Sequence, residues 1–434
     1  MKEIVMVILA AGKGNRFSPF VTGKPLFPFL GKPLVTFSLP QTYPPSIARC
    51  VVVASPENRD LFSSMQFPVP HDVVVQESAS GMAGAIQAAK DLIRGKSILI
   101  VIADDVADEA LVGKVLKAAK PDVFGVITTW KPKTYFPGGY VMFREDRPIG
   151  IREKPGIGNT PSDSVYFGGQ YIAKADALIE AIDAITTPSD DIYEQALSSL
   201  MSRERFSVVV NDREFVSLKY PWHVLDMTAY MLTHHLTSGK GKNVDIRNNV
   251  SLEGVVYLGN NVKIFENTKI IGPVYIGDNT IVGNNNIIRE SIIGSNCVTG
   301  FNTDITRSYI GDDCWFHSNY IGDSVLEGNV SMGSGSVLAN LRLDENVIHS
   351  IVSEEKMNTG RTKLGSMIAQ DVRIGVNVSV MPGVKIGSNS FIGAGITLDK
   401  DIPAESFCTA VSSYTVKKNT ARISKNRDQY KAKI

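Results

Sequence analysis

A short segment near the start of the chain has the residue types of a phosphate-binding loop. The apolar run Ile4–Ala11 leads directly into Gly12-Lys13-Gly14-Asn15-Arg16. Small residues let the backbone approach a ligand closely, and consecutive N–H groups can surround phosphate oxygens. Arg16 adds a fork of donors that suits phosphate. The Gly-Lys-Ser/Thr ending of a P-loop is absent, so the segment predicts a different kind of phosphate site.

Further charged and polar residues follow this loop and give it a context. They are Lys24 in Lys24-Pro25-Leu26, Gln76 with Gly81-Met82-Ala83, Asp104-Asp105 at a strand end, and Glu153-Lys154-Pro155. Each has a structural interpretation as well. The lysines can be ordinary surface residues, and the two aspartates can form a turn or a helix cap.

A second set of reactive residues lies in the C-terminal half, at His317-Ser318-Asn319-Tyr320-Ile321-Gly322-Asp323. His317 is the one histidine among the repeats described below, because His349 falls in an interruption of them. A neutral imidazole can take a proton from an amine as the amine attacks a thioester. A lone histidine can also be structural, so the residue by itself leaves both interpretations open.

The elements that position the first set follow an α/β pattern. Ile4–Leu9, Cys50–Ala54, Val73–Gln76 and Ile98–Ala103 are short, apolar and β-branched, which predicts strands buried on both faces of a mostly parallel sheet. Helices are expected between them, at Gly84–Ile93 and Leu111–Ala119. We therefore predict an α/β, Rossmann-like domain over residues 1–236.

The second half has a different, repetitive pattern. Ile-Gly or a close variant recurs from Leu258-Gly259 to Ile321-Gly322, and Ile374, Val380, Ile386, Ile392 and Leu398 fall six residues apart. Such a period indicates a solenoid with one inward aliphatic per hexad and Gly, Asn or Asp at the corners. We expect a linker over 237–249, a β-helix over 250–410, and a solvated basic tail over 411–434. Leu341–Leu364 is polar and irregular, which predicts a functional loop leaving the solenoid.

Composition excludes several classes of protein. The formal net charge of +1 argues against a nucleic-acid binder or anionic-membrane binder that works by bulk charge. The longest apolar run is far shorter than the ~20 residues that span a bilayer, and the start of the chain lacks a secretory signal pattern. Four cysteines without CxxC spacing favour neither zinc nor disulfides, so we expect a cytoplasmic protein.

In order and spacing, the N-terminal segments resemble sugar-1-phosphate nucleotidylyltransferases, which join a nucleoside triphosphate to a sugar 1-phosphate and release pyrophosphate. The resemblance covers roughly residues 1–235 and implies UTP or dTTP as substrate, with Mg²⁺ held by Asp105. It implies that Arg16 and Lys24 are catalytic. The implied nucleotide-binding residues are Leu9, Ala11, Gly12, Gly14, Asn15, Gln76 and Gly81, and the implied sugar-phosphate ligands are Gly139, Glu153 and Lys154.

The sequence departs from that family at the metal site. Asp104 takes a position where the family usually has Gly. The family also carries a second metal carboxylate in a Trp-x-Asp-x-Gly-x-Pro stretch, where this chain has Ser217 for Asp and Lys219 for Gly. A hydroxyl is a poor ligand for a hard cation. The hypothesis is that the site keeps substrate binding with reduced or altered metal dependence, with Lys219 supplying part of the positive charge.

The hexads resemble the left-handed β-helix of hexapeptide-repeat proteins, which commonly trimerise, so we expect a homotrimer. Residues 245–410 resemble the acetyltransferase domain of bifunctional N-acetylglucosamine-1-phosphate uridylyltransferase/glucosamine-1-phosphate acetyltransferases, including archaeal relatives. That resemblance implies His317 as general base, Tyr320 and Asn340 as sugar-phosphate ligands, and Ser366 and Ala394 along acetyl-CoA. Two lysines of the family are missing, and Arg307 and Arg342 are their candidate substitutes.

The predicted function is nucleotidyl transfer to a sugar 1-phosphate, coupled to acetyl-CoA-dependent N-acetylation of an amino-sugar 1-phosphate. Two alternatives remain open. The solenoid can be a trimerising scaffold for a nucleotidylyltransferase alone, or the N-terminal domain can be a degenerate regulatory nucleotide binder attached to an acetyltransferase.

Overall fold

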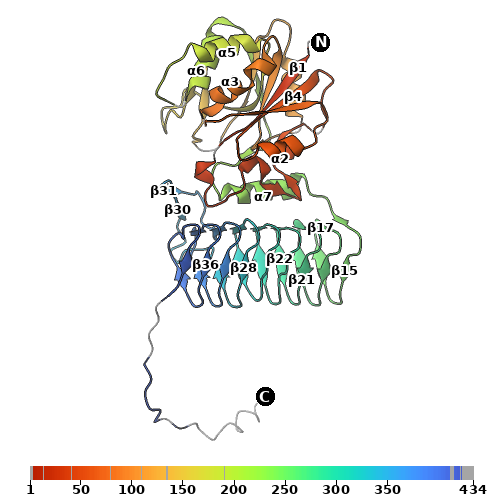
Figure 1. Cartoon of the computed structure of the whole chain (residues 1–434), viewed down its shortest axis with the longest axis vertical. Helices are drawn as coiled ribbons and strands as arrows, with labels where there is room; N and C mark the ends of the chain where they lie inside the picture. Colours follow the sequence, from red (N-terminus) through yellow and green to blue (C-terminus); the bar gives the residue numbers. More distant parts are fainter. Residues whose placement is uncertain are drawn as a thin grey trace.

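The computed structural model describes residues 3–12, 14–40, 42–78, 80–108, 110–132, 135–189, 191–410, 415–420 and 422. The chain forms an α/β domain that rests on the side of a long solenoid of stacked coils (Figure 1). The predicted fold class, an α/β domain followed by a left-handed parallel β-helix, is confirmed.

The α/β domain is built on a nine-stranded mixed sheet within the described residues. The four strands predicted from the sequence are parallel neighbours in the order β6-β1-β4-β5. The remaining strands extend the sheet beyond β6, and β11 pairs antiparallel with β6, β8 and β9. In chain order the strands are β1 (Ile4–Ala10), β4 (Ile47–Ala54), β5 (His71–Val75), β6 (Ser97–Ile102), β8 (Gly125–Trp130), β9 (Gly139–Arg144), β10 (Arg147–Glu153), β11 (Val165–Ile172) and β12 (Phe206–Val210).

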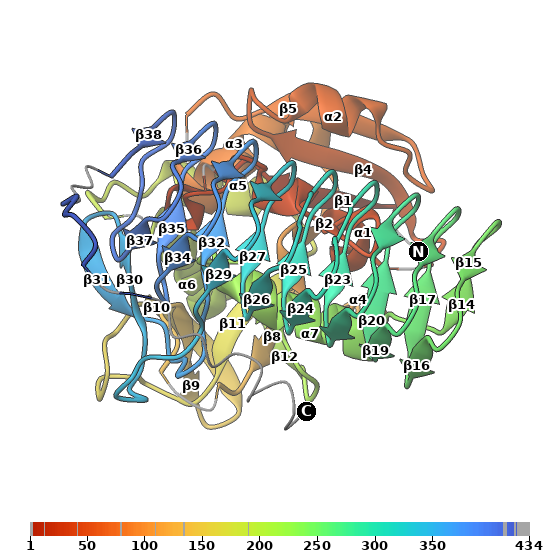
Figure 2. The same cartoon turned by 90° about the horizontal axis from the view of Figure 1, so that it is seen from below.

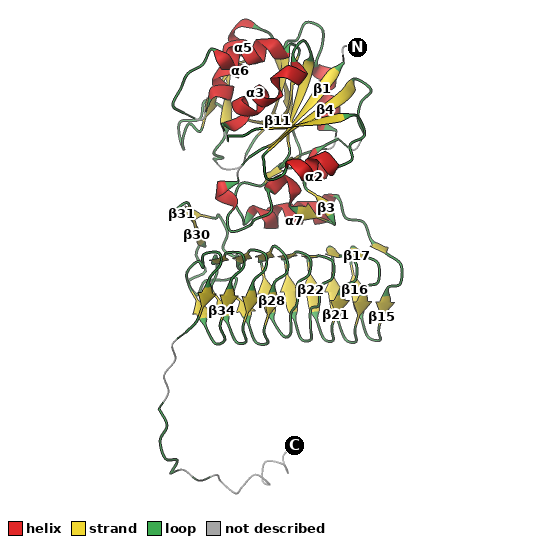
Figure 3. Ribbon diagram, viewed as in Figure 1, coloured by secondary structure: helices red, strands yellow, loops and turns green. Residues whose placement is uncertain are grey.

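Helices cover both faces of this sheet, giving three layers (Figure 3). One face packs against α3 (Gly81–Ile93), α5 (Ala175–Asp183) and α6 (Ile192–Arg203). The other packs against α1 (Val35–Ser38), α2 (Arg59–Ser64) and α4 (Leu111–Ala118). The alternating inward residues of β1 serve both cores, which explains its unbroken apolar sequence. In contrast, β5 is the edge strand and is only half-buried, so the prediction of burial on both faces was wrong for it.

Short elements join the sheet to the solenoid. Two 3₁₀ turns follow β1, η1 (Asn15–Phe17) and η2 (Lys24–Leu26), and then a small hairpin of β2 (Pro28–Phe29) and β3 (Lys32–Pro33). A two-residue ladder pairs β7 (Asp105–Val106) with β13 (Val216–Ser217). Helix α7 (His223–His234) lies between the sheet and the solenoid (Figure 1).

The solenoid has three faces of parallel, in-register strands. The face toward the α/β domain comprises β14 (Gly239–Lys240), β17 (Val256–Leu258), β20 (Val274–Ile276), β23 (Ile292–Ile293), β25 (Tyr309–Ile310), β27 (Val325–Leu326), β32 (Met367–Ile368) and β35 (Lys385–Ile386). A second comprises β16 (Ser251–Glu253), β19 (Lys269–Ile271), β22 (Ile287–Arg289), β24 (Asp304–Thr306), β26 (Tyr320–Gly322), β29 (Val337–Leu338), β34 (Ser379–Val380) and β37 (Thr397–Leu398). The third comprises β15 (Asp245–Ile246), β18 (Lys263–Ile264), β21 (Ile281–Val282), β28 (Ser331–Met332), β33 (Arg373–Ile374), β36 (Phe391–Ile392) and β38 (Phe407–Cys408).

The repeat in the sequence explains the coils. Each inward aliphatic lies above the one a coil earlier, as Ile270, Ile288 and Ile305 do, and forms a continuous dry core. One corner is a ladder in which Asn243, Asn261 and Asn279 adopt positive φ values of 58–59° and hydrogen-bond to one another. Asparagine tolerates this left-handed conformation better than most residues. Viewed from below, the coils form a regular row from β14 to β38 (Figure 2).

Three predicted segments can be compared with the coils. Residues 341–364 do leave the solenoid, and they carry a hairpin of β30 (His349–Val352) and β31 (Glu355–Asn358). The linker predicted at 237–249 is corrected, because β14 and β15 already pair with the next coil there. Residues 237–249 belong to the first coil, which stacks against a neighbour on one side only. Its residues are therefore more polar than those of later coils, and this polarity resembles that of a linker. Of the predicted tail, 415–420 and Arg422 are exposed, and the rest lies outside the described residues.

A fourth hydrophobic core joins the two domains. It combines Phe27, Phe29 and Trp222 of the α/β domain with Tyr309 and Met367 of the solenoid. Residues of the 341–364 excursion also contribute to it. The domains therefore share an interface with an apolar core. In the part of the chain that the structure describes, no helix has the length and apolar character needed to cross a membrane.

Candidate functional site

The loop after β1 opens into a cavity of about 380 Å³. A methyl group added at Gly12 would meet nothing within 4 Å, so the backbone there faces free space. Gly14 has a φ of +63°, a conformation that glycine adopts without strain. Every predicted nucleotide-binding residue lines this cavity: Leu9, Ala11, Gly12, Gly14, Asn15, Gln76 and Gly81, together with Arg16 and Lys24. Lys13 lies outside the described residues.

The side chain of Gln76 is held in a fixed orientation at the end of β5. Its amide nitrogen donates to the carbonyl oxygen of Gly81 at 3.2 Å and to Ser80 Oγ at 3.3 Å. A Cβ at Gly84 would come within 2.7 Å of that nitrogen, so glycine is required there. The first turn of α3 therefore fixes the orientation of the Gln76 amide, which lines the cavity.

A second cavity, of about 240 Å³, adjoins the first and shares Arg16, Lys24 and Asp104 with it. The Lys24 ammonium lies 3.4 Å from a carboxylate oxygen of Asp104. The remaining predicted residues of this domain, Asp105, Gly139, Glu153 and Lys154, all line the second cavity. Residues from distant parts of the sequence thus meet around two connected spaces.

Asp105 is a partly buried carboxylate that lines this second cavity. Burial raises its pKa to about 6, and neighbouring Asp104 adds to the rise. Hydrogen bonds from the Ser217 hydroxyl and from the Gly168 amide, at 3.4 Å, oppose it. Ser217 is the direct cross-strand partner of Asp105 in the β7–β13 ladder. The position where the family resemblance implies a second carboxylate is therefore beside Asp105, and it holds a hydroxyl.

Lys219 brings a fourth cation to the same cavity, beside Arg16, Lys24 and Lys154. Its ammonium donates to the carbonyl oxygen of Pro137 at 3.1 Å and lies 3.6 Å from the centre of the Phe136 ring. Burial lowers its pKa to about 8, although Asp105 favours the charged form. A cation held by a ring face and a carbonyl is fixed in position.

The β9–β10 pair positions the predicted sugar-phosphate residues. Gly139 and Glu153 are cross-strand partners, and the Lys154 ammonium lies 3.0 Å from a Glu153 oxygen. A Cβ at Gly139 would lie 2.1 Å from the Tyr166 ring, so packing alone already requires this glycine. Tyr166 in turn donates to the Glu194 carboxylate. Tyr166 and Glu194 line the cavity but were not predicted, because nothing in β11 or α6 marks them in the sequence.

Of the predicted C-terminal residues, Tyr320 and Asn340 meet at the edge of the second solenoid face, and His317 precedes β26. His317 is exposed at a corner, and its backbone amide donates to Asn319 Oδ1 at 2.9 Å. Tyr320 and Asn340 meet above Gly322, since a Cβ there would lie 2.7 Å from the Tyr320 hydroxyl and 2.6 Å from Asn340 Nδ2. Glycine leaves room for both polar groups, one coil apart.

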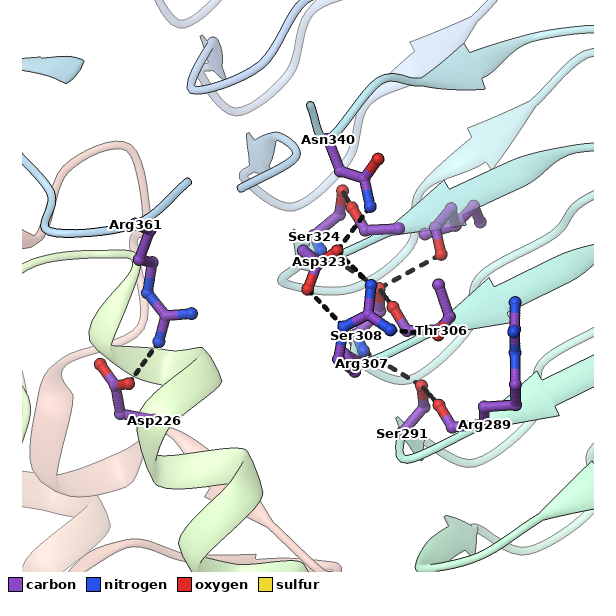
Figure 4. A network of polar contacts seen from close by, with 12 residues as sticks. Asp226, Arg289, Ser291, Thr306, Arg307, Ser308, Asp323, Ser324, Asn340 and Arg361 are labelled. Carbon is purple, nitrogen blue, oxygen red and sulfur yellow. Dashed lines mark hydrogen bonds and ion pairs between the residues drawn. The ribbon is translucent and has the colours of Figure 1, made fainter. Parts of the chain in front are cut away.

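A buried carboxylate organises this edge (Figure 4). Asp323 accepts two hydrogen bonds of 2.7 Å from the Arg307 guanidinium and one of 2.5 Å from Asn340 Nδ2. Arg307 is therefore neutralised by Asp323. The predicted substitute Arg342 is paired with Asp344 in the same bidentate way on the exposed excursion.

The two residues predicted along acetyl-CoA have different surroundings. Ala394 is exposed at a corner of the solenoid. Ser366 is fully buried, and its amide donates to Ser324 Oγ at 3.1 Å. It ends an internal ladder in which Ser291, Ser308 and Ser324 each accept from the next coil's backbone amide. The prediction for Ser366 is therefore corrected: its hydroxyl faces the solenoid interior, where a coenzyme cannot reach it.

Comparison with known proteins gives matches in both domains. A family model described as nucleotidyl transferase matches residues 5–216, and one described as bacterial transferase hexapeptide (six repeats) matches 255–290 and 365–398. The chain is 31% identical over 428 residues to the bifunctional protein GlmU of Methanococcus maripaludis, covering 92% of this chain and 96% of that protein. It is 28% identical over 403 residues to the bifunctional sugar-1-phosphate nucleotidylyltransferase/acetyltransferase of Sulfurisphaera tokodaii, covering 91% and 97%.

Proposed function

Because this chain belongs to the family of bifunctional GlmU proteins, we propose that it carries two transferase sites, one in each domain. The first joins a nucleoside triphosphate to a sugar 1-phosphate and releases pyrophosphate. The second transfers an acetyl group from acetyl-CoA to the amine of an amino-sugar 1-phosphate. The product of the second site is then a substrate for the first, which accounts for both domains in one chain.

The observation that carries the first activity is the pair of adjoining cavities that share Arg16, Lys24 and Asp104. The triphosphate lies along the loop after β1, and the sugar phosphate lies by Glu153 and Lys154. A phosphate oxygen of the sugar 1-phosphate attacks the α-phosphorus, forming a new P–O bond while the bond to the β-phosphate breaks. Arg16 receives the departing pyrophosphate and Lys24 neutralises charge between the two substrates.

We propose that the first cavity takes a pyrimidine nucleotide. The fixed amide of Gln76 can read the hydrogen-bonding edge of a base, and uracil and thymine present the same groups there. We therefore propose UTP or dTTP as the donor.

The residues of the second cavity fit a Mg²⁺ ion. Mg²⁺ is commonly held by one or two carboxylates plus substrate phosphates, and Asp105 faces the cavity next to Asp104. Asp105 would hold the ion, and the bound ion would supply positive charge to the phosphates. Ser217 offers it only a neutral oxygen, while Lys219 contributes a cation of the protein's own. We propose an altered rather than an ordinary metal dependence on these grounds.

Acetyl transfer is assigned to the edge formed by His317, Tyr320 and Asn340. The exposed His317 imidazole takes the proton from the amine nitrogen while that nitrogen attacks the thioester carbon, and the CoA thiolate leaves. This assignment is supported by the meeting of the Tyr320 hydroxyl and the Asn340 amide over Gly322. The Asp323 carboxylate fixes Asn340 by accepting a hydrogen bond from its Nδ2. Acetyl-CoA would pass Ala394.

We further propose a cytoplasmic homotrimer. The four cysteines are all free thiols, which fits a reducing compartment. Hexapeptide-repeat solenoids commonly assemble as trimers, and the measurement that tests this is the mass in solution.

One observation favours a second candidate function for the N-terminal domain. Ser217 and Lys219 replace the carboxylate and glycine implied by the family resemblance, as in a domain that binds nucleotide without turning it over. The deciding experiment measures pyrophosphate release with UTP or dTTP, Mg²⁺ and a panel of sugar 1-phosphates, and CoA release with acetyl-CoA and glucosamine 1-phosphate. We expect both products. CoA release without pyrophosphate would favour the regulatory alternative, and pyrophosphate without CoA would make the solenoid a scaffold.

A further inference from the structure

The segment that carries Lys24 rests on the solenoid. Between the phosphate-binding loop and α1, the rings of Phe17, Phe20 and Phe27 pack against one another. Phe27 also lies against Tyr309 of the solenoid, with ring centres 5.1 Å apart. The backbone that presents Lys24 to the two cavities is therefore part of the interface between the domains.

A single solenoid carboxylate binds the backbone just before Lys24. Glu327 follows β27 and has only 6% of its surface exposed. Its carboxylate accepts hydrogen bonds from the amide of Val21, at 3.0 Å, and from the amide of Thr22, at 2.6 Å. It also accepts from the Gln370 amide of its own domain, at 3.1 Å. Hydrogen bonds to an ionised acceptor are stronger than neutral ones, so this contact fixes the loop firmly.

A second solenoid side chain binds the same segment on the other side of Lys24. The hydroxyl of Tyr309 donates to the carbonyl oxygen of Pro28 at 2.7 Å, and the side chain is buried. Lys24 begins the turn η2 between these two anchors. Its ammonium meets Asp104 at 3.4 Å on the side of the cavities.

We infer that Glu327 and Tyr309 are positioning residues for Lys24, so that the solenoid completes the nucleotidyl-transfer site of the other domain. The inference rests on the proposed nucleotidyl transfer. It gives the solenoid a role in that reaction that is independent of acetyl transfer and of assembly.

The informative variant is Glu327→Gln, because it keeps the size and shape of the side chain. The amide has one acceptor oxygen instead of two, and its NH₂ group would face backbone donors. We expect a loss of about tenfold in kcat/KM for nucleotidyl transfer and a similar rise in the Kd of UTP or dTTP, since a hydrogen bond to a charged group is lost. Acetyl transfer by the same preparation should be unchanged, which shows that the solenoid is intact.

The matched control is Glu266→Gln, which removes the same charge from a solenoid carboxylate whose hydrogen-bond donor, Asn284, lies in the solenoid too. It should leave both activities unchanged. Tyr309→Phe removes only the second anchor and should give a smaller loss in the same direction as Glu327→Gln.

A double-mutant cycle separates positioning from general stability. Nucleotide Kd is measured for wild type, Glu327→Gln, Lys24→Ala and the double variant, because binding can be followed even without turnover. If Glu327 acts through Lys24, its substitution should change Kd by less than about twofold once Lys24 is absent. The inference alone is overturned if Glu327→Gln changes Kd equally with and without Lys24. It is also overturned if Glu327→Gln has no effect although the wild type is active. A wild type that neither binds the nucleotides nor releases pyrophosphate overturns the proposed function and the inference with it.

Discussion

Ser217 lies directly across from Asp105 in the β7–β13 ladder, and its hydroxyl hydrogen-bonds the Asp105 carboxylate. Ser217, which stands where the family resemblance implies an aspartate, therefore contacts the remaining carboxylate directly. The substitution replaces a potential metal ligand with a group that supports the remaining one, in a cavity that also holds the Lys219 ammonium.

The metal dependence should follow from this pair. Ser217→Asp adds a second carboxylate beside Asp105, so the Mg²⁺ concentration for half-maximal nucleotidyl transfer should fall about tenfold. Ser217→Ala removes a hydrogen bond that lowers the pKa of Asp105, so activity should fall most near pH 6. Mg²⁺ titrations of the wild type, Ser217→Asp and Ser217→Ala, carried out at pH 6 and at higher pH, measure both effects. Ordinary Mg²⁺ saturation that neither substitution changes would contradict the hypothesis.

The pH dependence of nucleotidyl transfer should be bell-shaped. Asp105 has a pKa raised to about 6, so its charged form appears as the pH rises through that value. Lys219 has a pKa lowered to about 8, so its charge is lost above it. kcat/KM at limiting Mg²⁺ reports both groups in the metal-free enzyme, because a bound ion would lower the pKa of Asp105. Lys219→Arg keeps the charge at all these pH values and should abolish the alkaline limb. If the alkaline limb persists in Lys219→Arg, it reports the titration of a group other than Lys219, and the prediction fails.

Substitution of His317 should affect acetyl transfer without affecting nucleotidyl transfer. His317→Ala removes the proposed base and should reduce acetyl transfer at least about a hundredfold. Nucleotidyl transfer should be unchanged, because His317 lies on the solenoid and outside both N-terminal cavities. Parallel assays of CoA and pyrophosphate release check this. Equal loss of both activities, or of neither, would count against the assignment.

Asp323 should support acetyl transfer through Asn340. Asp323→Asn leaves Arg307 without its buried counter-ion, so we expect a loss of about 2–3 kcal/mol in the free energy of unfolding. One acceptor oxygen then serves both Arg307 and Asn340, so Asn340 is held less firmly and KM for the amino-sugar phosphate should rise. Asp344→Asn is the matched control, because it breaks an equally bidentate but exposed pair with Arg342. Comparable losses in the two variants would argue against a special role for Asp323.

His223 should make the protein less stable in acid. Burial lowers its pKa from 6.5 to about 4, and its Nδ1 lies 3.2 Å from the Ser217 carbonyl oxygen. The unfolded chain therefore binds a proton between these values that the folded chain does not. Stability is complete above pH 6.5 and declines as the pH falls toward 4, by about 3 kcal/mol in total. Urea unfolding at pH 7 and pH 5 measures the decline, which His223→Gln should reduce.

Local sequence determined much of this protein. The apolar run of β1, buried on both sides, and the small residues after it predicted a phosphate-binding loop where the larger cavity opens. The six-residue period determined the coils, because in-register stacking repeats each inward aliphatic and each Asn corner. Polarity alone located the 341–364 excursion, since irregular polar residues cannot form a stacked core.

Other features depended on contacts between distant residues, which no local pattern records. Ser366 has the sequence surroundings of a surface loop, yet coil stacking turns its hydroxyl inward. The residues at 237–249 look like a linker until the next coil supplies strand partners. Glu327 is an ordinary corner residue in sequence, and only the docking of the two domains brings the Val21 and Thr22 amides to its carboxylate. Hydrogen bonds and burial of this kind arise only when the coils stack and the domains pack, so the tertiary structure alone decided them.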